Sequence, residues 1–222
     1  MLTIHHLNNS RSQRVLWLLE ELAVPYRIEH YQRDAKTNLA PESLKAVHPL
    51  GKSPVLTDDE VVVAESAVII EHLIEHHGQG RFQPSAASEA ARQARYWLHY
   101  AEGSLMPFLV MSLVFRKIKE APMPFFIKPV AKGIANQVMQ SFVEPNVSTH
   151  LRYIDTHLAT HTWFAGDELS AADFQMIFPL EAAISRSTLA QQLPNIAAYV
   201  KRVHARPAYQ QALSKGGPYD YA

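Results

Sequence analysis

The segment LTIHHLNNSRSQRVLWLLEEL, residues 2–22, has the pattern of a strand, a polar loop and an amphipathic helix. Residues 2–7 form a short, mostly apolar run that fits a strand, and the polar run 8–12 follows it. Apolar residues then recur with the spacing of one helix face, at Val15, Leu18, Leu19 and Leu22. A helix that directly follows a strand is typical of an α/β unit.

The rest of the first third continues this alternation. The first helix should end before Pro25. A second strand is expected over 26–31, a short helix over 41–47, and a hairpin from 54–56 and 61–64 around the turn Asp58-Asp59. A further helix is expected from Glu65 to Gly78.

No strand pattern follows residue 86. Helices are expected over 86–119, 124–158, 170–185 and 196–213, the last with a break near Pro207. The glycine- and proline-rich residues 78–84 indicate a boundary. We therefore expect an α/β domain over 1–78, a linker over 79–85 and an all-α domain over 86–222.

Composition narrows the function classes. The 222 residues are 47% hydrophobic, and the 21 basic and 21 acidic side chains give no net charge. Such a chain has no net field to attract nucleic acid or an anionic membrane. It also has no cysteine, so thiol chemistry would have to come from a bound partner.

The compartment is predicted from the N-terminus, which lacks the basic start and apolar run of a secretory signal and favours a cytoplasmic protein. The most apolar window, 103–115, lies between Glu102 and Arg116. A bilayer span needs about 20 residues, so this window is interpreted as part of a core helix.

The polar loop Asn8 to Ser12 is the first candidate for a functional site. Serine and asparagine are common helix caps whatever the function of a protein. The same position, however, lies at the N-terminus of a helix, where unpaired N–H groups and the helix dipole stabilise an anion. A serine hydroxyl there could donate a hydrogen bond to a thiolate.

Two further segments carry candidate residues. The first, HPLGKSPVL, residues 48–56, is a turn that runs into a strand, and a cis bond before Pro54 would expose the backbone of Ser53 to an extended peptide. The second, AESAVII, residues 64–70, opens a helix with Glu65 and Ser66. These two residues either cap the helix or bind the carboxylate and ammonium of a free amino-acid end group.

Four segments, in this order, resemble the cytosolic glutathione transferase family over nearly the whole chain. SRSQRVLWLLEEL, residues 10–22, is similar to the first helix of bacterial and fungal members. HPLGKSPVL resembles the family's cis-proline segment, ESAVII its γ-glutamyl-binding helix start, and GDELSAAD, residues 166–173, its capping-box segment. The resemblance implies a thioredoxin-like N-terminal domain and a helical C-terminal domain.

The resemblance also implies glutathione as the co-substrate and assigns residues to it. Glu65 and Ser66 would hold the γ-glutamyl end, the backbone of Ser53 before Pro54 the cysteinyl unit, and Lys52 the glycyl carboxylate. His48 and Arg11 are further binding candidates. Ser10 matches the position from which serine-type members stabilise the thiolate, and Ser12 and Asn9 are the alternatives within the loop.

The electrophile, by the same resemblance, would bind between the domains, and a homodimer is implied. Candidates for the pocket share one apolar helix, where plain core packing is the alternative interpretation: Tyr100, Met106, Phe108, Met111 and Phe115. Ser170 and Asp173 have the spacing of a capping box and are assigned a structural role.

Two alternative functions and one sequence pattern that resembles a metal site also have to be considered. A binding or regulatory module with this fold but without turnover would keep the same tripeptide site, and a ligand carrier would bind apolar molecules between the domains. His72 and His76, with Glu75, match an inverted zinc-protease pattern. With twelve histidines in the chain such a match arises easily, so no metal site is expected.

Overall fold

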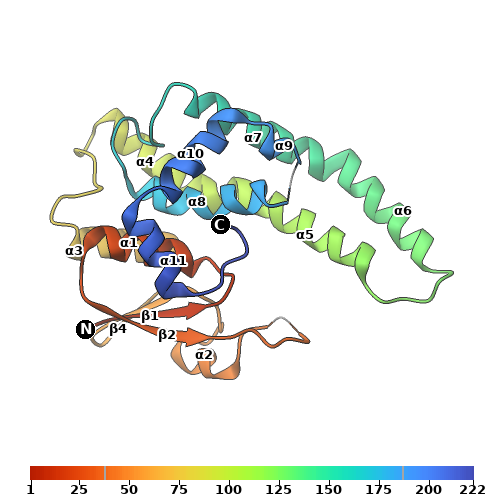
Figure 1. Ribbon diagram of the computed structural model, residues 1–222, viewed down its shortest axis with the longest axis horizontal. Coiled ribbons are helices and arrows are strands. Elements are labelled where there is room, and N and C mark those ends of the chain that lie inside the picture. Colours follow the sequence, from red (N-terminus) through yellow and green to blue (C-terminus); the bar gives the residue numbers. More distant parts are fainter. Residues whose placement is uncertain (38, 187) are drawn as a thin grey trace.

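The computed structural model describes residues 1–37, 39–186 and 188–222, and its strands all belong to one four-stranded sheet near the N-terminus (Figure 1). The strands are β1 (Leu2–Leu7), β2 (Tyr26–Tyr31), β3 (Val55–Asp58) and β4 (Val61–Ala64), in the order β2-β1-β3-β4. Strand β1 runs parallel to β2 and antiparallel to β3, and β4 is antiparallel to β3. The strand predictions for β1, β2 and β4 are confirmed residue for residue.

Helices cover both faces of this sheet. Helices α1 (Ser12–Leu22) and α3 (Ser66–His77) lie between the sheet and the helical layer, whereas α2 (Glu42–Val47) lies on the opposite face (Figure 1). The apolar stripe of α1 is fully buried, and Trp17 contacts the helical layer through Phe174, with ring centroids 4.5 Å apart. On the other face, Leu44 of α2 packs with Leu7 and Tyr31.

The helical layer begins with one continuous helix over Glu89–Glu120. It consists of α4 (Glu89–Tyr100), a π-helical turn η1 (Ala101–Leu105) and α5 (Met106–Glu120). The return helix is built in the same way from α6 (Lys128–Val138), η2 (Met139–Val143) and α7 (Glu144–Leu158). The sequence predicted two uninterrupted helices over nearly these spans, and the π turns are the difference.

Helix α8 (Ala171–Ile184) is the centre of this layer and packs against α4, α1 and α3. Almost every residue of it is buried. Its N-terminus contains the capping box expected at Ser170 and Asp173, since Asp173 Oδ2 accepts from the Ser170 N–H at 2.9 Å and from its hydroxyl at 3.1 Å. Burial raises the pKa of Asp173 to about 6.

The chain then returns to the first domain. Helix α9 (Thr188–Gln191), which the sequence analysis did not predict, precedes α10 (Pro194–His204) and α11 (Pro207–Gly216). Pro207 separates the last two helices, as expected. Helix α11 packs along α1, and Tyr209 contacts Trp17. The last helix of the chain therefore covers the first.

The helix Glu89–Glu120 is, by length and composition alone, apolar enough to cross a membrane, and it is the one such helix in the described ranges. It is longer than the apolar window that the sequence analysis compared with a bilayer span. Its contacts with α8 and with the α6–α7 helix pair are those of a member of the helical layer.

Candidate active site

A cavity of about 280 Å³ lies between three parts of the chain: the end of the loop after β1, the start of β3 and the start of α3. All seven residues that the sequence analysis assigned to tripeptide binding line it: Arg11, His48, Lys52, Ser53, Pro54, Glu65 and Ser66. They come from three segments that are separate in sequence. Glu102 of η1 lies on the opposite wall and is contributed by the helical domain.

The Ser53–Pro54 segment is held against β1. The bond between the two residues is cis. The Ser53 hydroxyl donates to the His5 carbonyl at 2.9 Å and accepts from the Leu7 N–H at 3.2 Å. These two hydrogen bonds fix the wall of the cavity to the central strand.

Helix α3 presents its N-terminus to the cavity. Glu65, just before the helix, has φ of +71°, a backbone conformation that residues other than glycine adopt only under strain. Ser66 is buried, and neither side chain caps the helix. The capping interpretation of this pair is therefore not realised, and the first N–H groups of α3 remain available to a ligand.

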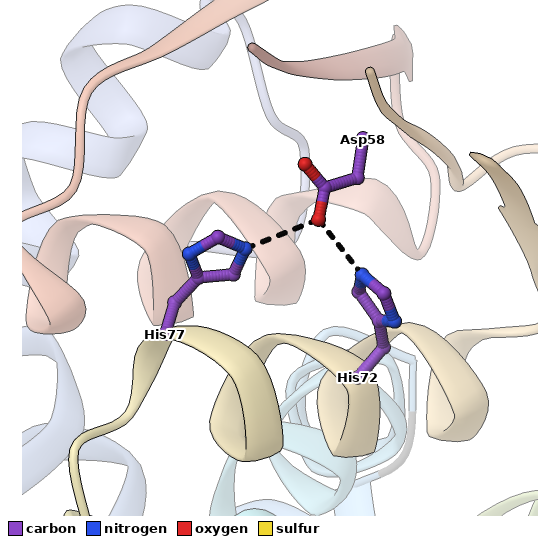
Figure 2. Close-up of side chains that lie close together, drawn as sticks. All are labelled: Asp58, His72 and His77. Carbon is purple, nitrogen blue, oxygen red and sulfur yellow. Dashed lines mark hydrogen bonds and ion pairs between the residues drawn. The ribbon is translucent and has the colours of Figure 1, made fainter. Parts of the chain in front are cut away.

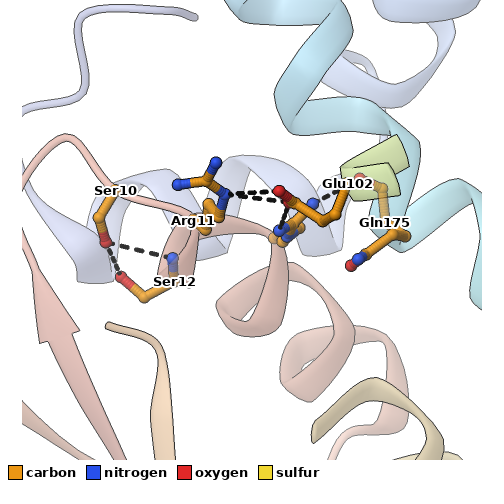
Figure 3. Close-up of polar contacts among 6 residues, drawn as sticks. Ser10, Arg11, Ser12, Glu102 and Gln175 are labelled. Carbon is orange, nitrogen blue, oxygen red and sulfur yellow. Dashed lines mark hydrogen bonds and ion pairs between the residues drawn. The ribbon is translucent and has the colours of Figure 1, made fainter. Parts of the chain in front are cut away.

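The serines of the first loop form a buried hydrogen-bonded chain (Figure 3). The Ser10 and Ser12 hydroxyl oxygens are 2.8 Å apart, and Ser12 Oγ is 2.8 Å from His6 Nδ1. Ser10 Oγ accepts from the Ser12 N–H at 3.2 Å and donates to Ser53 Oγ, on the cavity wall, at 3.4 Å. Ser10 is therefore the nearer of the two to the cavity, and Ser12 points inward.

His6, which the sequence analysis did not single out, ends this chain. Burial lowers the pKa of His6 to about 4, with a smaller contribution from His30, so its imidazole is neutral at pH 7. Because the ring also hydrogen-bonds the Gly216 backbone, Nδ1 is the acceptor and the Ser12 hydroxyl is the donor. The Ser12 hydroxyl thus donates to His6 at 2.8 Å, with the Leu7 carbonyl as a longer second acceptor at 3.4 Å, and its proton stays inside the protein.

Asn9 is directed elsewhere. Its side-chain amide donates to Asp220 Oδ2 at 2.8 Å and its amide oxygen accepts from the Asp220 N–H at 2.9 Å. Its backbone is left-handed, with φ of +49°, a conformation that asparagine tolerates. The side chain of Asn9 therefore anchors the C-terminal tail.

Glu102 joins the two domains at the cavity (Figure 3). Its carboxylate accepts from Arg11 Nε at 3.0 and 3.1 Å and from Arg14 Nη2 at 2.5 Å. Arg14 is fully buried and also donates to the Gln175 carbonyl at 2.6 Å. Both arginines lower the pKa of the Glu102 carboxyl, which keeps it ionised although burial opposes this. Sequence reasoning missed Glu102 because no local pattern marks it.

A second cavity, of about 370 Å³, adjoins the first loop on its other side. Of the five residues that the sequence analysis assigned to the electrophile pocket, Met106 lines this cavity. Tyr100, Phe108, Met111 and Phe115 are not among its lining residues. Helix α5 presents Phe108 to α7, where its ring lies 5.2 Å from that of His150, and Tyr100 hydrogen-bonds the same histidine.

The remaining walls of this cavity were not predicted. Apolar residues from α5 and α8 form one part of it, and the C-terminal tail contributes Asp220 and Tyr221. Four cationic side chains surround it: Arg11, Arg33, Lys117 and Arg186.

Comparison with known proteins agrees with this architecture. The family model described as "Glutathione S-transferase, N-terminal domain" matches residues 10–76, and that described as "Glutathione S-transferase, C-terminal domain" matches residues 119–215. The chain belongs to the glutathione S-transferase family. Its fold is the one expected, a thioredoxin-like domain followed by a helical domain.

Among its relatives are two fungal enzymes. Glutathione S-transferase 3 of Schizosaccharomyces pombe is 40% identical over 97% of this chain and 88% of its own length. Glutathione S-transferase 1 of Saccharomyces cerevisiae is 32% identical, with 97% and 95% covered.

Solved structures show the same fold. A glutathione S-transferase from Actinobacillus pleuropneumoniae superposes with a TM-score of 0.78 at 32% identity, covering 97% of this chain and 93% of that one. A sphingomonad glutathione S-transferase complexed with glutathione superposes with a TM-score of 0.72 at 20% identity, with 97% and 98% covered.

Proposed function

We propose that this glutathione S-transferase binds glutathione in the cavity between β3, α3 and Glu102, and conjugates it to electrophiles. The observation that carries the proposal is that all seven tripeptide-binding candidates line this one cavity. In this assignment, Glu65 and Ser66 hold the γ-glutamyl end at the N-terminus of α3. The backbone of Ser53 pairs with the cysteinyl unit, and Lys52 and His48 face the glycyl carboxylate.

Ser10 is the residue that we assign to the thiol. A free thiol with a pKa near 8.5 is only about 3% ionised at pH 7, so the site must stabilise the thiolate. The Ser10 hydroxyl lies next to the cavity wall, at 3.4 Å from Ser53 Oγ. The Ser10 hydroxyl donates to Ser53 Oγ over a long 3.4 Å and can also donate to Ser12 Oγ, whose own proton goes to His6, so in this proposal a thiolate in the cavity takes over the Ser10 donor. Ser12 and His6 then position Ser10.

The electrophile, in this proposal, enters the 370 Å³ cavity on the other side of the loop. Its wall combines apolar residues such as Met106 and Phe178 with the cations Lys117 and Arg186. Such a wall favours an apolar electrophile that also carries an anionic group. Reduction of hydroperoxides is a second reaction open to the same thiolate.

The molecule also carries apolar surface for a partner. Large exposed hydrophobic side chains occur on β4, α3 and α4, at Val62, Val68 and Tyr96. Isolated exposed apolar residues are common, but a homodimer, as in the family, would give these a partner. Light scattering on the purified protein measures this directly, and a monomeric mass at micromolar concentration contradicts it. We expect a cytoplasmic location.

One titration tests the enzyme against the catalytically silent binding module. The ultraviolet absorbance of the thiolate is followed against pH with the protein and glutathione together, and turnover of a chloronitrobenzene is measured in parallel. Ionisation of the bound thiol well below pH 8 together with turnover supports the transferase. Binding with an unshifted thiol and no turnover supports the regulatory module.

A further inference from the structure

One cluster of metal-ligating side chains lies outside the site described above. Asp58, the last residue of β3, faces two histidines of α3, His72 and His77 (Figure 2). Both imidazoles direct Nε2 at the same carboxylate oxygen, Asp58 Oδ2, at 3.0 Å and 3.1 Å. One ligand atom from each of the three residues lies within 4.8 Å of the other two.

The histidine pair differs from the one that the sequence marks. His72 and His76 are four residues apart and share a helix face, which is the usual metal-binding spacing. Residues five apart lie about 140° apart around a regular helix. His77 nevertheless reaches Asp58, because it is the last residue of α3. The pattern in the sequence marked His76 as the partner of His72, whereas in the structure His77 takes that place.

The chemistry of the cluster suits one class of ion. Two neutral imidazoles and a carboxylate are ligands that zinc and its first-row neighbours accept, whereas magnesium and calcium prefer oxygen alone. Zinc bonds of about 2.0–2.2 Å at tetrahedral angles place ligand atoms about 3.3–3.5 Å apart. The two histidine–aspartate distances, 3.0 Å and 3.1 Å, are a few tenths of an ångström shorter than this, and rotation of the imidazoles would open the space for an ion.

The exposure and the charge of these three side chains also fit a bound ion. The side chains of Asp58, His72 and His77 are 20%, 18% and 27% exposed, so an ion can enter and one coordination position remains open to water. The Asp58 carboxylate supplies a negatively charged oxygen ligand beside the two imidazole nitrogens.

We propose that Asp58, His72 and His77 form a binding site for a divalent cation of the zinc class. The ion would connect β3 to the C-terminal end of α3. The opposite ends of these two elements, at Val55 and Ser66, line the glutathione cavity. Along α3, Ser66 is about 9 Å from His72 and about 16 Å from His77, so the ion stabilises the frame of the cavity and takes no part in its chemistry.

Zinc chloride and the tag-free protein, first treated with a chelator, test this proposal by isothermal titration calorimetry and thermal unfolding. We expect one saturable site with a micromolar dissociation constant. Saturating zinc should raise Tm by about 5 °C or more, because the ion binds the folded chain. His72→Ala, His77→Ala and Asp58→Asn should each weaken binding at least tenfold and remove the rise in Tm.

His76→Ala is the matched control. It removes a neighbouring histidine of the same helix, whose ring lies 4.5 Å from that of His72, and should leave zinc binding unchanged. Absence of a saturable site in the wild-type chain overturns the proposal and leaves a hydrogen-bonded cluster only. Equal binding by His77→Ala also overturns it, because the ion would then be held by other histidines. Circular dichroism of each variant separates loss of ligand from loss of fold.

Discussion

Ser10 and Ser12 look interchangeable in the sequence, and their surroundings separate them. Both are buried and share a hydrogen bond. Ser12, however, is committed to His6, whereas Ser10 adjoins the cavity wall at Ser53. The difference arises from β1, which carries His6, and from the proline segment, and neither is visible in the loop itself.

We therefore predict a graded effect of the two serine-to-alanine substitutions. Ser10→Ala removes the hydroxyl that we assign to the thiolate and should lower kcat about 10- to 100-fold, with little change in glutathione affinity. Ser12→Ala disturbs only the position of Ser10 and should cost less. Steady-state kinetics against pH check this. A larger loss in Ser12→Ala would transfer the thiol contact to Ser12.

His6 should make the fold sensitive to acid. Its pKa is about 4 in the folded chain and 6.5 in an unfolded one, so the unfolded chain binds a proton first as pH falls. The contribution of His6 to the free energy of unfolding is complete above pH 6.5 and decreases by roughly 3 kcal/mol towards pH 4. Asp173 has a raised pKa, so its contribution to the free energy of unfolding increases as the pH falls from 6 to 4.

The difference between wild type and His6→Gln isolates the histidine, since Asp173 is common to both. Urea unfolding at pH 7, 6, 5 and 4.5 should show a free energy of unfolding that falls less steeply in the variant. Parallel pH profiles would show that His6 does not titrate in this window.

At the scale of elements, the π turn η1 is the feature that completes the site. Such turns add a residue to a helix and often occur at functional positions. Here the turn carries Glu102, which contacts Arg11 and Arg14 of the other domain. Helical periodicity predicted the long helix Glu89–Glu120 well, but it does not detect a single extra residue in one turn.

Glu102→Gln should destabilise the protein by about 2–3 kcal/mol, because the fully buried Arg14 loses its counter-charge. Glu120→Gln, an exposed change at the end of the same helix, is the control and should stay within about 0.5 kcal/mol of wild type. Urea denaturation of both variants measures the contrast. Equal stabilities would show that Arg14 is satisfied by Gln175 alone.

The whole molecule shows which parts of such a protein a sequence can predict. Local patterns placed the strands, the main helices and the capping box, because each of these depends on neighbours in sequence, and the seven residues predicted to bind the tripeptide line one cavity. The same patterns missed His6, Glu102, Asp220 and Tyr221, and of the five residues predicted for the electrophile pocket Met106 lines the 370 Å³ cavity. Each of these depends on which distant element packs alongside.

Two truncations test the connection between the chain ends. A chain that stops after Arg206 lacks α11, exposes the buried Trp17 and Leu16 of α1, and should lose at least 10 °C in Tm. A chain that stops after Gly217 keeps α11 but loses the hydrogen bond from Tyr219 to the buried Glu181, so its Tm should fall less than that of the shorter chain. It loses Asp220 and Tyr221 from the second cavity, so KM for the electrophile should change more than KM for glutathione. Equal Tm values would contradict the role of α11.

The packing of α11 on α1 also has a consequence for how the protein is made. The sheet and α1 are synthesised first, but α11, which packs on α1, leaves the ribosome last. Until then Trp17 and its neighbours lack their final partners, and a nascent chain with such a surface is exposed to aggregation. The cavity that we propose for glutathione, although built almost entirely from early residues, is thus expected to mature only when synthesis is nearly complete.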